Sequence, residues 1–505
     1  VQNPIPGGAT GFTTYMGVYY EYPKLTNIYK VSIKDTSYGS IFPLITAFEN
    51  LGKEYVLYAE PNYLHQSTST SPLTNDSLLS QQWAFGATKS DSIRREFQAS
   101  SKSDSAIVIA ILDSGVDTLH LDLRNKIHKT SYEINGQPGV DDDGNGFVDD
   151  FWGWDFVNGD NQPLDNLGHG THCASIAAAE NNNSVGIAGI AQDAMIRSYQ
   201  VLESNNGGTS SNIAQAVALA AMSGSDIISM SLGGYGRSLA LENALQYAYG
   251  FSFLVASAGN DGICIRADGQ MCPDGAFPSP SYPAAYSFVM GVQATKNWNY
   301  MGYRVGWSNY DLTGPYWSDY PDKFNYEVNA PGYGIFGALA SGNSGKYDRY
   351  RSWNGTSMAA PVVAGMISLY KTSFPSASNE EIFVKFINSW YYPDSVYSKY
   401  GGYPYNHVDL VEAYYGDQPA TPFMVNFDLV DTLQGNSDGN PDGGEIISLF
   451  GNIKNVGGHA DSVWAKISVG DFEDSTLIDV INDSVFLGQL SEFGVINNSF
   501  NPWTF

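Results

Sequence analysis

Short apolar runs and amphipathic stretches alternate along most of the chain. Residues 107–112 form a continuous apolar run, which is typical of a parallel strand buried on both faces. Similar runs predict strands at 195–201, 227–231, 253–257 and 288–292. Helical spacing of apolar residues predicts helices between these strands at about 171–180, 213–222 and 239–249, and a further helix at about 357–370. Residues 76–415 are therefore expected to form an α/β domain: a doubly wound, mostly parallel sheet with helices on both faces.

The residues beside these helices predict where the helices begin and end. Ser210, Ser211 and Asn212 are candidate caps of the second helix, because their side chains can accept its first N–H groups. Gly250 suits the position after the third helix, where a left-handed backbone is common. Pro361 suits the first turn of the fourth, where its missing N–H costs little.

The pattern differs at both ends of the chain. Residues 1–66 predict a small α+β unit, with strands at 28–33 and 55–58 and a helix at 41–51. A polar stretch at 67–75 has no periodicity, which is typical of a linker and of a cleavage site. Short alternating runs at 446–450, 463–469 and 476–481 predict a β-sandwich module over residues 418–505.

Composition and charge narrow the class of function. The formal net charge of −27 argues against nucleic-acid binding, which needs a basic surface. The sequence contains no run of 18 apolar residues, the length needed to span a membrane, so we expect no membrane span. The acidic, lysine-poor composition fits a secreted or cell-surface protein, and we expect a monomer. The start at Val1 without a signal-peptide pattern and the abrupt stop at Phe505 suggest a processed form or a fragment.

Two of the three cysteines lie close together in the sequence. Cys264 and Cys272 share a loop rich in Gly and Asp, and a disulfide between them is our preferred interpretation. Two unpaired thiols are the alternative.

Four polar residues stand at predicted strand ends or helix starts. Asp113 and Asn260 each follow a buried strand, while His169 and Ser357 begin apolar helices. Each alone has a simpler role: a turn for Asp113 and Asn260, and a helix cap for Ser357. His169 and His172, three residues apart, are also compatible with half of a zinc site, and hence with a metallohydrolase, but no further ligands occur at suitable spacing.

Together these residues resemble the subtilisin-like serine proteases over residues 76–415. Five motifs carry the resemblance: Asp113-Ser114-Gly115, His169-Gly170-Thr171-His172, Ser231-Leu232-Gly233-Gly234, Ala258-Gly259-Asn260 and Gly355-Thr356-Ser357-Met358-Ala359-Ala360-Pro361. The resemblance implies a catalytic triad of Asp113, His169 and Ser357, with Asn260 in the oxyanion hole. The alternative is a catalytically silent surface protein on the same scaffold.

The resemblance also implies where substrate would bind. The segments flanking the primary specificity pocket correspond to Ser231, Leu232, Gly233, Ala256, Ser257, Ala258 and Gly259. The Tyr282–Pro283 bond corresponds to a cis peptide of the family. Cys173 matches a thiol-bearing branch with thermitase-like and proteinase K-like members, in which it would lie buried and free beneath the histidine.

An acidic loop at residues 140–150 is the strongest candidate for a metal site. Alternating oxygen ligands and glycines suit Ca²⁺, although the glutamate that ends an EF-hand loop is missing. The predicted ligands are Asp141, Asp143, Asn145, the Phe147 carbonyl and Asp150. A solvated acidic loop is the alternative. Residues 438–445 form a second, weaker candidate.

The first unit resembles the inhibitory propeptide of the same family. Residues 58–63 are similar to the end of such propeptides, which implies a cleavage site between about 64 and 75. An unrelated N-terminal domain is the alternative. The sequence therefore predicts a secreted, calcium-stabilised serine endopeptidase that is made as a self-processed zymogen and acts on proteins and peptides.

Overall fold

The computed structural model describes most of the central part of the chain and short strands near both ends. The described residues are 74–97, 106–205, 207–265, 279–298, 301–311, 326–341, 346–389, 408 and 410–415, with residue 47 and the strands at 11–13, 19–21, 422–430, 448–455, 460–466, 484–490, 495–497 and 503–504. The chain divides into two compact units, Val1–Ser71 and Pro72–Phe505.

In the first unit, β1 (Gly11–Thr13) pairs antiparallel with β2 (Tyr19–Glu21). The strands predicted at 28–33 and 55–58 lie outside the described residues, as does nearly all of the helix predicted at 41–51. The α+β character of this unit therefore stays a prediction.

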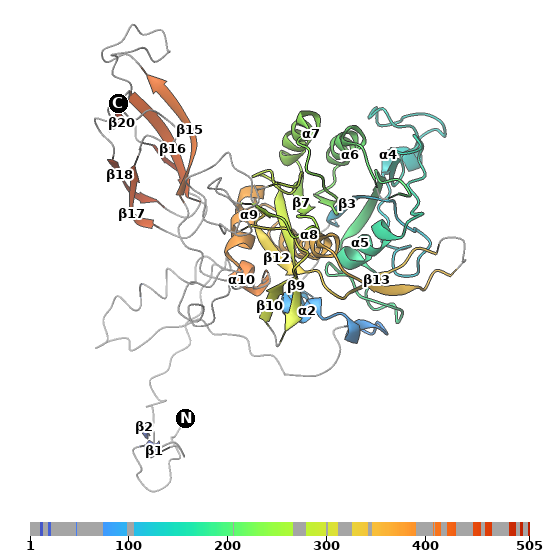
Figure 1. The fold of residues 1–505 in the computed structure, drawn as a ribbon, viewed down its shortest axis with the longest axis horizontal. Coiled ribbons are helices and arrows are strands. Elements are labelled where there is room, and N and C mark those ends of the chain that lie inside the picture. Colours follow the sequence, from blue (N-terminus) through green and yellow to red (C-terminus); the bar gives the residue numbers. More distant parts are fainter. Residues whose placement is uncertain are drawn as a thin grey trace. The chain divides into compact units, whose positions relative to one another are not determined.

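An eight-stranded sheet forms the centre of the second unit (Figure 1). Its strands run in the order β10-β9-β7-β6-β3-β5-β4, with β12 also paired to β9. They are β3 (Val108–Asp113), β4 (Gly153–Asp155), β5 (Met195–Gln200), β6 (Ile227–Met230), β7 (Phe253–Ser257), β9 (Met290–Trp298), β10 (Met301–Arg304) and β12 (Val328–Pro331). Every pairing is parallel except that of β10 with β9, so the predicted mostly parallel sheet is confirmed.

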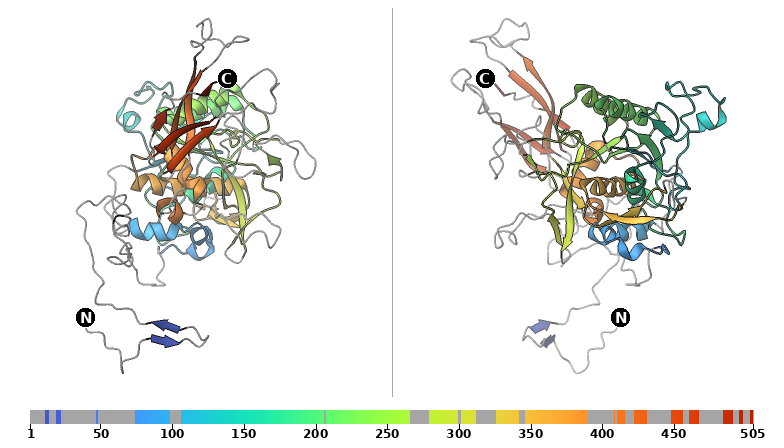
Figure 2. Two further views of the ribbon diagram at one scale, coloured as in Figure 1. Left: turned by 90° about the vertical axis from the view of Figure 1, so that its left-hand side faces the viewer. Right: turned by 45° about the vertical axis from the view of Figure 1, so that its right-hand side comes forward.

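The sheet separates two hydrophobic cores because successive side chains of a strand point to opposite faces. In β3, Ile109 and Ile111 belong to one core and Ala110 and Leu112 to the other. Helices α5 (His169–Ala178) and α8 (Thr356–Ser373) pack into the first core, and α6 (Ser210–Met222) and α7 (Leu239–Tyr249) into the second. Figure 2 shows this arrangement from two further sides. Each aliphatic side chain buried in this way contributes about 1.5–3 kcal/mol.

Three details at the helix ends differ from the predictions. Thr209, one residue before the predicted caps, caps α6 by accepting the N–H of Asn212 at 3.2 Å. Gly250 ends α7 with φ −68°, so it is a right-handed cap and not a left-handed residue. Pro361 lies inside α8, beyond its first turn. Apolar residues at helical spacing lie on both sides of this proline, so the helix continues through it.

Further short elements surround the sheet. They are η4 (Leu79–Gln81), α2 (Ala84–Ala87), α3 (Ser90–Phe97), α4 (Ser131–Asn135), β8 (Cys264–Ile265), β11 (Tyr310–Asp311), β13 (Ile335–Ala338), β14 (Tyr350–Trp353), α9 (Asn379–Asn388) and α10 (Leu410–Tyr415). Hairpin β13–β14 packs on α5, and Ser378 and Glu381 form a capping box at α9.

The C-terminal residues form antiparallel strands. β15 (Pro422–Val430) pairs with β16 (Ser448–Asn455), which also pairs with β19 (Val495–Asn497) and β20 (Trp503–Thr504). β17 (Ala460–Lys466) pairs with β18 (Ser484–Leu490). The run predicted at 476–481 lies outside the described residues, and the sandwich arrangement stays a prediction. Within the described part of the chain, no helix is both long and apolar enough to cross a membrane.

Candidate active site

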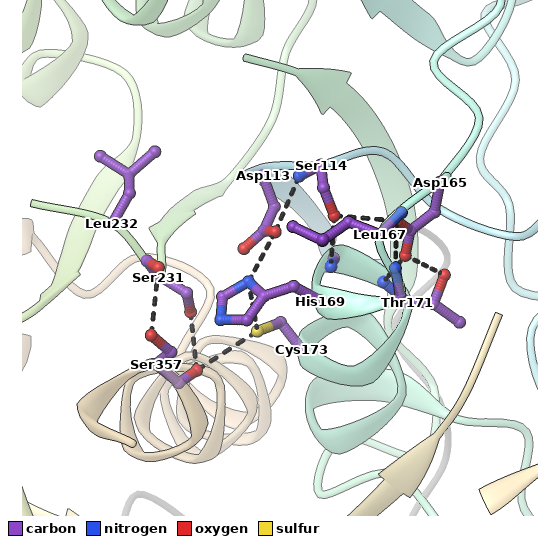
Figure 3. A network of polar contacts seen from close by, with 12 residues as sticks. Asp113, Ser114, Asp165, Leu167, His169, Thr171, Cys173, Ser231, Leu232 and Ser357 are labelled. Atoms are coloured by element: carbon purple, nitrogen blue, oxygen red, sulfur yellow. Dashed lines mark hydrogen bonds and ion pairs between the residues drawn. The ribbon is translucent and has the colours of Figure 1, made fainter. Parts of the chain in front are cut away.

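Asp113 and His169 meet at the carboxyl end of the central sheet (Figure 3). Asp113 is the last residue of β3 and is fully buried, while His169 is the first residue of α5. The His169 Nδ1 atom lies 2.7 Å from Asp113 Oδ1, which also accepts the Ser114 N–H at 2.7 Å. A carboxylate in this position fixes the proton on Nδ1 and leaves Nε2 as the basic nitrogen.

Two glycines allow α5 to approach β3 so closely. A Cβ atom on Gly170 would lie 2.1 Å from the Gly115 carbonyl oxygen and 3.1 Å from the Asp113 Cβ. Gly115 has φ +97°, and a Cβ atom there would lie 2.6 Å from the Leu164 backbone. A larger residue at 170 would push α5 and its histidine away from Asp113, whereas a larger residue at 115 would be strained and would clash with the segment before α5.

Asp165 anchors the start of α5, and the sequence analysis missed it. Its buried carboxylate accepts the N–H groups of Gly168 at 2.7 Å and Thr171 at 2.8 Å and the Ser114 hydroxyl at 2.9 Å. Burial raises the pKa of Asp165, and these hydrogen bonds oppose the shift. Asp165 lies three residues before Gly168, the cap position of α5, so the usual N-cap pattern in the sequence did not identify it.

The surroundings of His169 favour its charged form. Burial alone would lower the pKa of the imidazole, but the negative charge of Asp113 and its hydrogen bond to Nδ1 raise it well above its ordinary value. An imidazolium that forms during a proton transfer is therefore stabilised at this position.

Ser357 lies in the first turn of α8, next to the histidine site. Its hydroxyl donates to the Ser231 carbonyl at 3.2 Å. Its main-chain carbonyl accepts from the Ser231 hydroxyl at 2.8 Å and from the Cys173 thiol at 3.3 Å. Cys173 Sγ also lies 4.0 Å from His169 Nδ1, so the thiol contacts both the predicted base and the predicted nucleophile.

Thr356, which the sequence analysis did not assign, orients Asn260. The side-chain oxygen of Asn260 accepts the Thr356 N–H at 2.9 Å and its hydroxyl at 3.0 Å. The Thr356 hydroxyl is also within 3.1 Å of the Gly259 N–H, which donates to it. Because the amide oxygen faces Thr356, the Asn260 NH₂ group points away from it and can donate elsewhere.

The two predicted substrate segments lie side by side. The Ser257 hydroxyl donates to the Leu232 carbonyl at 3.4 Å. Ala256 and Ala258 are fully buried behind the surface, whereas Gly233 is exposed. A Cβ atom on Gly233 would lie 2.7 Å from the Ser281 hydroxyl oxygen, and one on Gly259 would lie 3.5 Å from it. Ser281 therefore sits between the two segments.

Tyr235 and Asp261 connect the same two segments further out. The Tyr235 hydroxyl donates to Asp261 at 2.5 Å and accepts from the buried Asn309 side chain at 3.0 Å. Asn309 also donates to the Ala258 carbonyl at 2.9 Å. The Tyr282–Pro283 peptide, which directly follows Ser281, is cis as expected.

His172 and Cys173 lie on α5 close to His169. His172 Nε2 lies 2.9 Å from the Arg351 carbonyl, and its ring stacks on Trp353 at 4.7 Å. Burial lowers the pKa of His172 to about 4. The Nε2 atom of His172 is thus paired with a main-chain carbonyl, which gives no support to a zinc site built on both histidines. Cys173 is free and buried, as predicted.

At the acidic loop three carboxylates converge, and one of them, Glu133 of α4, was not predicted. Oxygen atoms of Glu133, Asp143 and Asp150 all lie within 4.8 Å of one another. Asp141 instead accepts the N–H groups of Gly144 and Gly146, each at 2.8 Å, and so shapes the turn.

The remaining predicted ligands lie in the same loop. The Asn145 side chain donates to Asp150 at 3.3 Å and accepts the Phe147 N–H at 2.8 Å. Burial raises the pKa of Asp150 to about 7, and the charges of Asp143 and Glu133 add to the shift while Arg197 and Asn145 oppose it. The second candidate, at 438–445, lies outside the described residues.

Only one cysteine of the predicted disulfide belongs to the described part of the chain. Cys264 is buried in β8, and Cys272 lies outside the described residues. The bond stays a prediction.

Comparison with known proteins agrees with this geometry. A thermophilic serine proteinase of Bacillus sp. (strain AK1) is 34% identical over 332 residues, which cover 66% of this chain and 66% of that protein. Thermitase of Thermoactinomyces vulgaris is 35% identical over 273 residues, covering 54% of this chain and 77% of its own length. An extracellular protease of Xanthomonas campestris pv. campestris is 33% identical over 345 residues, covering 64% and 54%.

The chain thus matches about half to three quarters of each relative's length. The model of the subtilase family matches residues 104–412, which is more than half of the chain and includes Asp113, His169, Asn260 and Ser357. The chain therefore belongs to the subtilase family, a family of serine endopeptidases.

Proposed function

We propose that this protein is a serine endopeptidase that cleaves proteins and peptides through an acyl-enzyme formed on Ser357. The observation that carries the proposal is the 2.7 Å contact between His169 Nδ1 and Asp113, with Ser357 held beside them through Cys173. A fluorophosphonate reagent tests the assignment, because it reacts with an activated serine. Mass spectrometry is expected to find the label on Ser357, and a folded protein that stays unlabelled would contradict the proposal.

The mechanism begins at the Ser357 hydroxyl. A serine hydroxyl is a weak nucleophile, so His169 Nε2 takes its proton as Oγ attacks the substrate carbonyl. To do this, Oγ turns from the Ser231 carbonyl, where it donates at 3.2 Å, towards the imidazole. Asp113 stabilises the imidazolium, which then protonates the leaving amine. Water attacks the acyl-enzyme by the same route in the second half of the reaction.

The negative oxygen of the tetrahedral intermediate needs donors that are already in place. We assign this role to the Asn260 NH₂ group, whose orientation Thr356 sets, and to the Ser357 N–H in the first turn of α8. The positive end of the helix dipole favours negative charge at the same place.

Replacing Asn260 by alanine is expected to lower kcat by about 10²–10³-fold with little change in KM, because the donor acts mainly in the transition state. Steady-state kinetics on a peptide substrate measures both constants. Asn125→Ala, which removes an exposed asparagine outside the site, serves as the control. An unchanged kcat in a folded Asn260→Ala protein would rule out this role.

Calcium binding by the acidic loop is a second part of the proposal. Carboxylate oxygens are the ligands that Ca²⁺ prefers, and Asp150 Oδ1 is buried without a hydrogen-bond partner among the described residues. Glu133, Asp143 and Asp150 would hold the ion, with Asp141, Asn145 and the Phe147 carbonyl as further candidate ligands. The ion would neutralise the repulsion between these carboxylates and so stabilise the loop.

Removing calcium with EDTA is expected to lower the thermal unfolding midpoint by about 4 °C. Ligand at 100 times its Kd stabilises the folded state by about 2.7 kcal/mol, and an unfolding entropy of about 2.1 cal/mol/K per residue makes each kcal/mol worth about 1.4 °C in a domain of roughly 340 residues. Calorimetry on a Ser357→Ala protein avoids self-digestion. Asp150→Asn should abolish most of the difference and the exposed Glu203→Gln should preserve it. Equal midpoints with and without EDTA would argue against the site.

Three further features complete the proposal. Residues 1–66 act as an inhibitory propeptide that the enzyme removes by cleavage between about 64 and 75. The protein is secreted, in keeping with the extracellular relative, and a Cys264–Cys272 disulfide fits that compartment. Intact mass before and after reduction tests both the cleavage and the disulfide.

A further inference from the structure

The main-chain carbonyl of Ser357 lacks its usual helical partner. In an α-helix the carbonyl of one residue accepts the N–H of the residue four positions later. That later residue is Pro361, which lies inside α8 and has no N–H. The helix therefore leaves unpaired the carbonyl of the residue that carries the proposed nucleophile.

Two side chains from other parts of the fold take the place of the missing donor. The Ser231 hydroxyl donates to the Ser357 carbonyl at 2.8 Å, and the Cys173 thiol donates at 3.3 Å (Figure 3). Ser231 directly follows β6, and Cys173 lies on α5, the helix that begins with His169. Both side chains are buried, at 5% and 1% exposure, so water does not readily replace them.

Ser231 contacts Ser357 a second time. Its own carbonyl accepts the Ser357 hydroxyl at 3.2 Å, so the two serines form a reciprocal hydrogen-bonded pair. Ser231 therefore holds both the hydroxyl and the main-chain carbonyl of Ser357. Cys173, which lies 4.0 Å from His169 Nδ1, connects the same carbonyl to the base.

We propose that Ser231 and Cys173 are positioning residues that hold the Ser357 carbonyl in place of the helix bond removed by Pro361. This inference rests on the proposed role of Ser357 as nucleophile. Fixing this carbonyl fixes the peptide plane after Ser357 and the first turn of α8. The Ser357 hydroxyl then starts from a defined position, at the Ser231 carbonyl, when it turns towards His169. Such alignment affects the chemical step more than substrate binding, so its loss appears in kcat.

The two donors differ in strength. A hydroxyl is a good donor and a thiol a weak one, and the Ser231 contact is also the shorter. Ser231→Ala is therefore expected to lower kcat about tenfold, and Cys173→Ala about two- to threefold, with KM changed less than twofold. Cys173→Ser keeps a donor and should retain most of the activity.

A double-mutant cycle between Ser231 and Pro361 tests the proposal directly. Pro361→Ala gives α8 back an N–H that can pair with the Ser357 carbonyl. In that background, Ser231→Ala is expected to lower kcat by only about twofold instead of tenfold. A merely structural role of Ser231 would not depend on Pro361, so equal losses in the two backgrounds would overturn the proposal.

Ser229→Ala is the matched control. Ser229 lies in β6, two residues from Ser231, and its hydroxyl is buried without a partner among the described residues. Its replacement should leave kcat unchanged in both backgrounds. If Ser231→Ala fails to fold, a Cys173→Ala and Pro361→Ala cycle asks the same question of the second donor, with the two- to threefold loss expected to disappear.

The failure of this inference differs from failure of the proposed function. If Ser357→Ala loses both activity and fluorophosphonate labelling, Ser357 is the nucleophile whatever the cycle shows. An absence of coupling between Ser231 and Pro361 in that case removes only the positioning role. If Ser357→Ala keeps its activity, both proposals are wrong.

Discussion

Ser357→Ala is expected to abolish peptidase activity, with a loss in kcat of about 10⁶-fold, the size known for the same substitution in subtilisin. Alanine leaves Asn260 and the helix N-terminus in place but removes the only oxygen proposed to form the acyl-enzyme. Hydrolysis of a fluorogenic peptide measures the loss. The variant should also keep the linker between 64 and 75 intact, because it cannot process itself.

A second serine in the same helix provides the control for this prediction. Ser373 ends α8, far along the helix from Ser357, and its hydroxyl lies 2.8 Å from the Tyr414 hydroxyl. Ser373→Ala should keep nearly full activity. Equal turnover by wild-type protein and a folded Ser357→Ala protein would refute the assignment of the nucleophile.

The central fold was predictable because its strands are buried on both faces. A run such as 107–112 has to be apolar throughout, and two cores then receive its alternate side chains. The edge of the sheet was less readable. β9 continues to Trp298, beyond the run predicted at 288–292. Its last residues pair with β10, which runs antiparallel to it. After residue 292 the sequence of β9 becomes mostly polar, so the continuous apolar signal ends before the strand does.

The residues predicted for the site are those for which the proposed reaction requires a particular type of side chain. A base, its carboxylate, a nucleophile and an amide donor, all at strand ends and helix starts, together fit acyl transfer far better than four unrelated turns and caps. Residues that act on these groups were not predictable, because their partners are distant in sequence. Asp165 supports α5, Thr356 orients Asn260, and Glu133 joins the acidic loop from a preceding helix. Single-chain periodicity carries no information about such contacts.

Pro361 was predicted from its motif, but its effect on the helix was not. A proline near a helix start suggests a harmless first-turn position. In α8 it lies deeper, and its missing N–H concerns the carbonyl of Ser357 itself. The Ser231 hydroxyl and Cys173 thiol, 126 and 184 residues away in sequence, provide the compensating donors. Only the three-dimensional arrangement connects the proline with the nucleophile.

Asp113→Asn is expected to lower kcat by about 10⁴-fold, the size known for this change in a serine protease triad. The buried carboxylate accepts both the Ser114 N–H and His169 Nδ1 at 2.7 Å. Its second oxygen is buried without a hydrogen-bond partner among the described residues. An asparagine would place an NH₂ group there or turn it towards His169, and in either case the negative charge that stabilises the imidazolium is gone.

The pH dependence separates this loss of charge from a general disturbance of the site. His169 acts as a base only when neutral, so activity falls on the acidic side of its pKa. Burial lowers this pKa, but the charge of Asp113 raises it well above its ordinary value. Removing the Asp113 charge should therefore move the acidic limb of kcat/KM to lower pH, besides reducing its plateau. Asp117→Asn, a buried aspartate whose oxygens pair with the N–H groups of Leu119 and Ser341, should leave the limb in place. An unmoved limb in Asp113→Asn would show that Asp113 holds the ring without setting its charge.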